Sequence, residues 1–122
     1  MPVRSLSSSV LIWPDRAGVE HAVWRWAEAV AHERPDVVRI GVFGSFARGD
    51  WGMGSDLDLL VLVADSDKPF PARASDFDTT SLPVPADLLV YTEAEWDALR
   101  SERRRLARTA EREARWLYTR PR

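Results

Sequence analysis

The chain has 122 residues, with 17 Lys or Arg against 19 Asp or Glu, and its net charge is −2 at pH 7. That length suits one domain with a buried core, so we expect a single domain over residues 1–122. The slightly acidic composition argues against nucleic acid as a direct ligand, and no apolar run is long enough to cross a membrane. Cysteine is absent, which excludes disulfides and thiolate metal sites. Because the N-terminus also lacks the apolar core of a signal peptide, we expect a cytoplasmic protein.

The charge is unevenly distributed along the chain. From Glu93 onward there are 9 Arg and 6 acidic residues, a net charge of +3, which leaves −5 for residues 1–92. The C-terminal part is therefore the place to look for an anionic or acidic partner. Three consecutive arginines at residues 103–105 favour a solvated helix face over a nucleic-acid site, because acidic residues lie nearby and no aromatic residues interleave with them.

The first predicted helix lies between Asp15, which can cap its N-terminus, and Pro35, which ends it. Its apolar residues recur with helical spacing and form one stripe, which should pack on a sheet: Val19, Val23, Trp26 and Val30. Trp24 lies off this stripe, and we expect it at the rim of the core or partly exposed.

A strand, a glycine-serine turn and a second strand are predicted between residues 38 and 63. Residues 38–43 alternate as a strand does, and Gly44 ends it. Residues 46–48 can form a helical turn with Ser45 at its N-cap. A glycine at the junction of a strand and a helix lets a phosphate approach backbone N–H groups. Further glycines allow the connection to the second strand to adopt many backbone conformations.

Two carboxylates, Asp56 and Asp58, begin the apolar second strand. Residues two apart in a strand share a face, so both side chains should point the same way, as joint coordination of a divalent cation requires. A third carboxylate, Asp87, is the only charge in the apolar run at residues 84–91, which also predicts a strand. Between these strands, residues 64–83 should form a loop with a short helical turn near residues 72–78, because prolines are frequent there.

The last predicted helix begins at Thr92, which forms a capping-box pattern with Glu95. Apolar residues continue at three- and four-residue spacing as far as Leu117. Residues 116–118 either end this helix or leave it to add a short strand.

Residues 44–49 and 55–59 together resemble the signature of the DNA polymerase beta-like nucleotidyltransferases, in the spacing of the minimal, single-domain branch. The resemblance implies that Asp56, Asp58 and Asp87 are catalytic metal ligands, with two Mg²⁺ ions or, as the alternative, Mn²⁺. It also assigns four residues to nucleotide binding: Gly44, Ser45, Arg48 and Ser55. The expected fold is α/β (α+β), a small mixed sheet with the three Asp residues on one open face and the first and last helices packed on the other.

The minimal branch commonly acts with a helical HEPN-domain partner, as the nucleotidyltransferase half of a toxin–antitoxin pair. The resemblance therefore implies transfer of AMP from ATP to a hydroxyl of that partner, with a tyrosine side chain as the first candidate acceptor. Two alternatives stay open: a catalytically silent antitoxin that acts by contact, and a stand-alone enzyme, dimeric for example, that modifies a small molecule. The sequence leaves the nucleobase, the acceptor and the oligomeric state open.

Overall fold

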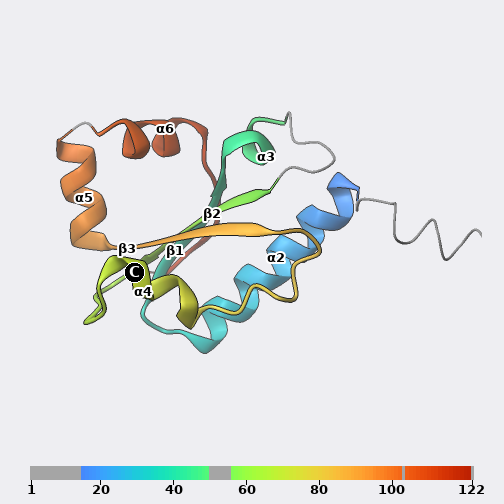
Figure 1. Ribbon diagram of the computed structural model, residues 1–122, viewed down its shortest axis with the longest axis horizontal. Coiled ribbons are helices and arrows are strands. Elements are labelled where there is room, and N and C mark those ends of the chain that lie inside the picture. The colour runs from blue at the N-terminus through green and yellow to red at the C-terminus, as the bar shows by residue number, and fades with distance from the viewer. Residues whose placement is uncertain (1–14, 50–55, 103, 122) are drawn as a thin grey trace, which may run out of the picture.

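The computed structural model describes residues 15–49, 56–102 and 104–121 (Figure 1). Its helices and strands follow in the order α2 (Arg16–Glu33), β1 (Val37–Phe43), α3 (Gly44–Arg48), β2 (Leu57–Val63), α4 (Phe70–Arg73), the 3-10 helix η1 (Ala74–Asp76), β3 (Ala86–Thr92), α5 (Glu93–Ser101), α6 (Arg105–Glu113) and β4 (Arg115–Thr119). Within these residues, no helix combines the length and the apolar character needed to cross a membrane.

The four strands form one mixed sheet in the order β3-β2-β1-β4. The central strand β1 is antiparallel to both β2 and β4, whereas β2 and β3 are parallel. A mixed sheet with helices is the predicted fold class, which is confirmed. The parallel β2–β3 pair matters most for the site, because it aligns the N-terminal ends of two strands that both begin with carboxylates.

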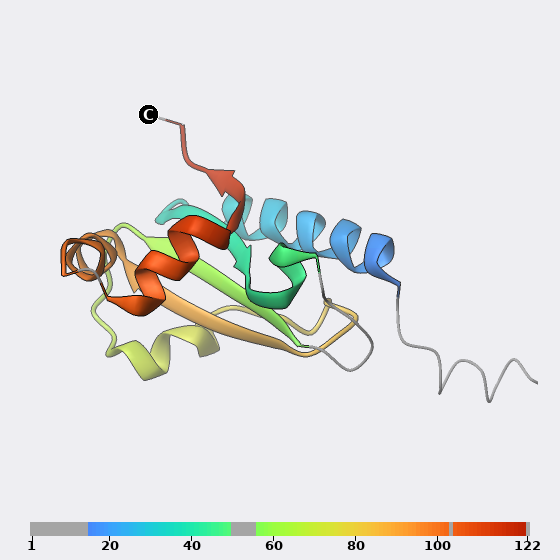
Figure 2. The same ribbon diagram turned by 90° about the horizontal axis from the view of Figure 1, so that it is seen from above.

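Helix α2 covers one face of the sheet, as its apolar stripe predicts (Figure 2). The Asp15 side chain accepts a hydrogen bond from Gly18 N and caps the helix N-terminus. Trp24 lies outside the stripe and is 41% exposed, as expected. The stripe packs against every second residue of β1 and β2, and the core on this face includes Val19, Val23, Trp26, Val30, Ile40, Val42, Leu57, Leu59, Val61 and Val63.

One detail of β1 differs from the predicted alternation. The pairing of β1 with β2 shifts between Val37 and Arg39. Val37, rather than Val38, therefore joins Ile40 and Val42 in the α2-side core, although Val38 is also buried. An extra residue in one strand moves the side chains before it to the opposite face of the sheet. The alternation of apolar residues in the sequence does not show this shift.

Helices α5 and α6 cover the opposite face of the sheet, so the prediction that the helices share one face is wrong. The core on this side contains Leu60, Leu62, Trp96, Ala107 and Ala110, with Phe43, Leu89, Tyr91 and Trp116 packed against it. Leu60 and Leu62 alternate with the residues that face α2. Because β2 is apolar on both faces, each face needs its own cover.

The prediction of a single long C-terminal helix is also wrong, because the chain forms α5, α6 and then β4. Helix α5 ends at its C-cap Glu102, and Arg104 has an extended backbone before α6 begins. Ala114 is extended again and leads into β4, which settles the open alternative for residues 116–118 in favour of a strand. The turn between α5 and α6 allows the apolar sides of both short helices to reach the same sheet face, which one straight helix could not do.

A partly buried ion pair ties the residues after β2 to the start of α5. Arg73 is 7% exposed and donates two hydrogen bonds to the Glu95 carboxylate, at 2.6 and 3.0 Å. Glu95 also completes the predicted capping box with Thr92, which is confirmed. The hydrogen bonds from Arg73, followed by those from Thr92, hold the pKa of Glu95 at about 2, below its ordinary 4.5.

Replacing Glu95 by glutamine should therefore make stability less dependent on pH. Because the pKa of Glu95 is lowered in the folded state, its ionised form contributes stability above pH 4.5 that is lost as the pH falls toward 2. We expect Glu95→Gln to reduce the free energy of unfolding by roughly 1–2 kcal/mol at pH 7, a figure discounted because the carboxylate is partly in solvent. The difference should shrink between pH 4.5 and 2 when urea denaturation is measured across that range. Asp97→Asn, which removes an exposed ion pair with Arg100 on the same helix, is the control and should cost under about 0.5 kcal/mol.

Candidate active site

The turn between β1 and α3 depends on Gly44. Its φ is +73°, in the left-handed region that favours glycine. A Cβ at this position would overlap the carboxylate oxygen Oδ2 of Asp58. The N-cap of α3 is Phe43, with no side-chain hydrogen bond, and not Ser45 as predicted. The helix begins two residues earlier than expected, because glycine can adopt the left-handed backbone that starts it.

The structure brings Asp58 and Asp87 side by side. They are directly paired in the parallel β2–β3 ladder, and each lies on the sheet face that α5 and α6 cover. Phe43, the residue before Gly44, pairs with Asp58 from the other side. Asp56 lies two residues before Asp58, immediately before β2, and is exposed. The three predicted carboxylates therefore gather at one end of two adjacent strands, on the α5–α6 face rather than the face opposite the last helices.

The charges of this cluster act on Asp58. Partial burial raises the pKa of Asp58 above its ordinary value, and the neighbouring charges of Asp87 and Asp56 raise it further, while Arg48 opposes the shift. Like charges held close together disfavour ionisation unless a cation compensates them. This electrostatic arrangement is typical of a cation-binding or catalytic site.

Arg48 ends α3 beside the carboxylates. Its guanidinium pairs with Glu113 of α6 at 3.3 Å, and its charge lowers the pKa of Asp58. Ser45 lies on the same short helix and is half-buried. The fourth predicted nucleotide-binding residue, Ser55, lies outside the described residues, as do the glycines at 52 and 54.

The donor set fits a hard divalent cation, since Mg²⁺ and Mn²⁺ prefer carboxylate oxygens. Burial, followed by the charges of Asp87 and Asp56, raises the pKa of Asp58, and a cation bound beside it would favour the ionised carboxylate. Among the described residues, no three side chains of His, Asp or Glu converge closely enough to enclose an ion as they stand. Joint coordination by Asp56, Asp58 and Asp87 therefore requires side-chain rotation, which the exposed Asp56 and Asp87 permit.

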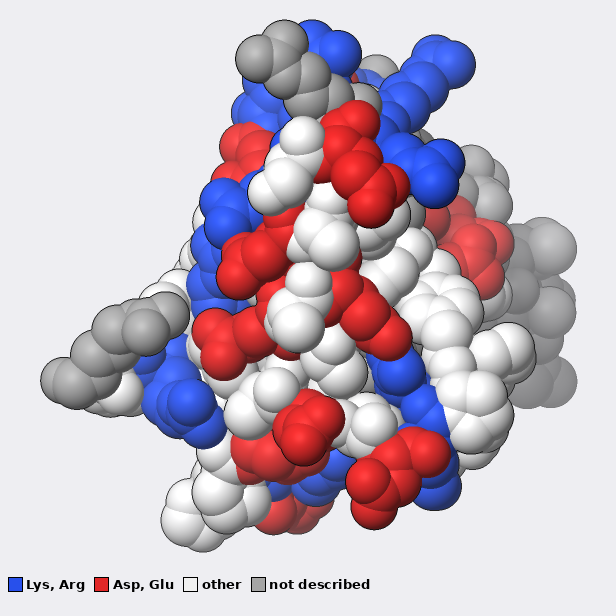
Figure 3. Space-filling view, turned by 90° about the vertical axis from the view of Figure 1, so that its left-hand side faces the viewer, with Lys and Arg blue, Asp and Glu red and all other residues white. Residues whose placement is uncertain are grey.

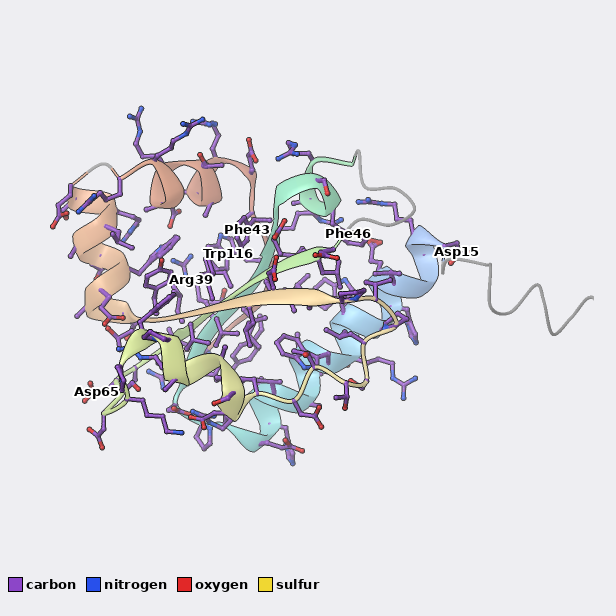
Figure 4. The ribbon with its side chains drawn as sticks, viewed as in Figure 1. Asp15, Arg39, Phe43, Phe46, Asp65 and Trp116 are labelled. Carbon is purple, nitrogen blue, oxygen red and sulfur yellow. The ribbon has the colours of Figure 1, made fainter. Side chains whose placement is uncertain are left out.

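Arg16, which no sequence pattern indicated, anchors α3 to α2. Its guanidinium stacks on the Phe46 ring at 4.3 Å, and its Nη2 donates a hydrogen bond of 2.8 Å to the Phe46 carbonyl oxygen. Figure 4 shows Phe46 on α3, facing the N-terminal end of α2 near Asp15. The contact spans thirty residues of sequence, so no local pattern could have indicated it.

A separate hollow of about 560 Å³ lies between α2 and the residues after α4. Its lining includes Trp26 and Phe77, which belong to the core on the face opposite Asp58. It contains none of the three carboxylates, so we do not assign the chemistry to it. Size alone is a weaker indication of an active site than clustered titratable groups.

The arrangement of the glycine turn and the paired strands agrees with the match to a known family. The profile of the nucleotidyltransferase domain matches residues 25–117. The chain belongs to the nucleotidyltransferase domain family. This family membership makes the chain a nucleotidyltransferase and confirms the resemblance drawn from residues 44–59. No curated protein sequence matches the chain.

Solved structures share the fold at low sequence identity. A candidate nucleotidyltransferase from Sulfolobus solfataricus is 21% identical, over 86% of this chain and 84% of that one, with a TM-score of 0.62. A toxin–antitoxin solved with AMP-PNP is 22% identical, over 83% and 73%, with a TM-score of 0.52. A mutant of the toxin–antitoxin MntA–HpeT is 20% identical, over 79% and 72%, also with a TM-score of 0.52.

Proposed function

We propose that this chain transfers AMP from ATP to a hydroxyl of a helical HEPN-type partner protein, a tyrosine in the first instance, in a Mg²⁺-dependent reaction. The pairing of Asp58 with Asp87 beside the Gly44 turn is the observation that carries the proposal. The toxin–antitoxin structures that share the fold support a partner protein, and the one solved with AMP-PNP supports an adenine nucleotide. We assign the reaction to a single domain in the cytoplasm, consistent with a cysteine-free chain.

In the proposed reaction the acceptor hydroxyl oxygen bonds to the α-phosphorus of ATP. The bond from that phosphorus to the oxygen bridging to the β-phosphorus breaks, and pyrophosphate leaves with the electron pair. Asp87 accepts the hydroxyl proton, a role that suits an exposed carboxylate at the mouth of the site. Asp56, Asp58 and Asp87 would hold Mg²⁺, which when bound would supply positive charge to the reacting oxygens.

The nucleotide-binding role falls to the turn and to α3. Gly44 lacks a side chain where the backbone passes the Asp58 carboxylate, so a triphosphate can approach both. Ser45 offers a hydroxyl on the first turn of α3, and Arg48 adds a positive charge at its end. Ser55 is proposed to complete this set.

Asp87→Asn tests whether the chain is an enzyme or a silent binder. If Asp87 accepts the proton, the variant should keep most of its ATP affinity, measured by calorimetry, because Asp56, Asp58 and the turn remain. Transfer of labelled AMP to the partner should fall by about 10²–10⁴-fold.

A silent antitoxin predicts a different outcome in cells. Contact alone would then protect against the partner's toxicity, and Asp87→Asn would rescue growth as well as the wild type does. Retained ATP binding with lost rescue supports catalysis, whereas full rescue by the variant would overturn the proposal. Parallel incubations with GTP, CTP and UTP identify the nucleobase.

A further inference from the structure

Helix α6 directs three arginines to one side. Arg105, Arg108 and Arg112 follow at helical spacing, so they share one face, while Ala107 and Ala110 face the core and are 0% and 1% exposed. The apolar side of α6 packs on the sheet. The arginine side is therefore held in a fixed orientation by the fold.

These arginines line a cleft between α6 and α3. Its volume is about 620 Å³, and its lining residues are Arg48, Arg105, Arg108, Thr109, Arg112 and Glu113. The single acidic residue, Glu113, pairs with Arg48. The cleft thus holds four guanidinium groups and one carboxylate, in a protein whose net charge is −2.

Other arginines in the C-terminal part of the chain have acidic partners. Arg100 pairs with Asp97, Arg104 with Glu102, and Arg115 with Glu20. Within the described part of the chain, no carboxylate forms an ion pair with the three α6 arginines of the cleft. Clustered like charges repel one another, so this group is suited to an anion supplied from outside.

The cleft adjoins the candidate active site. Arg48 lines it, and the charge of the same side chain acts on Asp58. Helix α3, which begins at the Gly44 turn, forms one wall. A peptide segment bound in the cleft would therefore lie next to the carboxylates at which the nucleotide is proposed to be transferred.

We propose that this arginine cleft binds an acidic segment of the acceptor protein, adjacent to the hydroxyl that receives the nucleotide. The inference rests on the proposed function and adds the chemistry of the acceptor to it. Guanidinium groups bind carboxylates through paired hydrogen bonds, and several together select a segment with several carboxylates.

The charge distribution favours a short acidic peptide over a nucleic acid. Glu113 is among the residues that line the cleft, and the neighbouring face of the molecule, around α5, carries a band of acidic side chains (Figure 3). A long polyanion that extended across this face would meet that band. A short acidic segment can end before it.

Binding of a synthetic peptide tests the cleft separately from catalysis. The probe is a fluorescent peptide in which one tyrosine is flanked on both sides by aspartates, and its anisotropy is followed without ATP or metal. We expect wild-type protein to bind it, and the variant Arg108→Gln with Arg112→Gln to bind at least about tenfold more weakly. The same peptide with asparagines in place of aspartates should not bind.

The matched control is Arg25→Gln with Arg104→Gln, which removes the same charge from exposed sites outside the cleft. An equal loss of binding in this control, no loss in the cleft variant, or tighter binding of a single-stranded RNA of equal charge would each overturn the proposal. AMP transfer to the peptide tyrosine is assayed separately. Specific binding without transfer would retain the acidic-segment site and count against the proposed function.

Discussion

Asp58→Asn is expected to abolish nucleotidyl transfer while leaving the fold at least as stable as the wild type. Asp58 lies between Phe43 and Asp87 in the sheet, and the charges of Asp87 and Asp56 both act on it. Loss of a metal ligand and its charge should reduce transfer by more than about 10³-fold. Asparagine keeps the size of the side chain, so the packing around Gly44 is unchanged.

The stability of this variant should depend on pH in a defined direction. Burial, followed by the charges of Asp87 and Asp56, raises the pKa of Asp58 in the folded state. Ionised Asp58 therefore destabilises the fold above that raised pKa, and protonation at lower pH removes the cost. Without metal, Asp58→Asn should be more stable than the wild type at pH 7, and the difference should disappear as the pH falls below the ordinary Asp range.

Asp67→Asn is the control for both measurements, because Asp67 is an exposed carboxylate in the loop after β2. It should change neither transfer nor the pH dependence of urea denaturation. Transfer by Asp58→Asn at the wild-type rate would refute the assignment of Asp58 as a metal ligand. A clear loss of stability at pH 7 would refute the electrostatic account of the cluster.

Gly44→Ala is expected to reduce both stability and transfer, although it adds only one carbon atom. Alanine at a φ of +73° is strained, and a left-handed backbone at a non-glycine residue costs about 1–3 kcal/mol. The new Cβ would also overlap Asp58 Oδ2, so the carboxylate must move. We expect a loss of unfolding free energy beyond the backbone strain, with transfer reduced by about 10²-fold or more because displaced catalytic groups lose that much.

Gly49→Ala separates these two effects. Gly49 has a φ of +91°, but a Cβ there has open space around it. Gly49→Ala should lose only the stability that the backbone strain costs, less than Gly44→Ala loses, and keep most of its transfer activity. Adding Asp58→Ala to Gly44→Ala should recover the excess stability loss, as a double-mutant cycle would show. Equal transfer by Gly44→Ala and Gly49→Ala would mean that the position of Asp58 does not depend on Gly44.

The sequence was informative where the physics is local. The cap of α2, the capping box at Thr92 and Glu95, and the two glycine-bounded strands follow from hydrogen bonds and side-chain spacing within a few residues. The predictions that were wrong concern features that depend on contacts with distant segments of the chain. One such feature is the break between α5 and α6, and another is the register shift in β1. Each brings apolar residues into contact with segments that are distant in the sequence.

For the site, the sequence by itself supplied the candidate residues: a glycine at a strand end, two carboxylates two residues apart and, through the family resemblance, one carboxylate in a later strand. It did so because these features depend on residue identity and short spacing. Only the tertiary structure decided that Asp87 pairs with Asp58, that Gly44 lies against the same carboxylate, and that the α6 arginines adjoin them through Arg48. These contacts depend on strand order, register and helix docking, which the burial of apolar surface over the whole chain fixes.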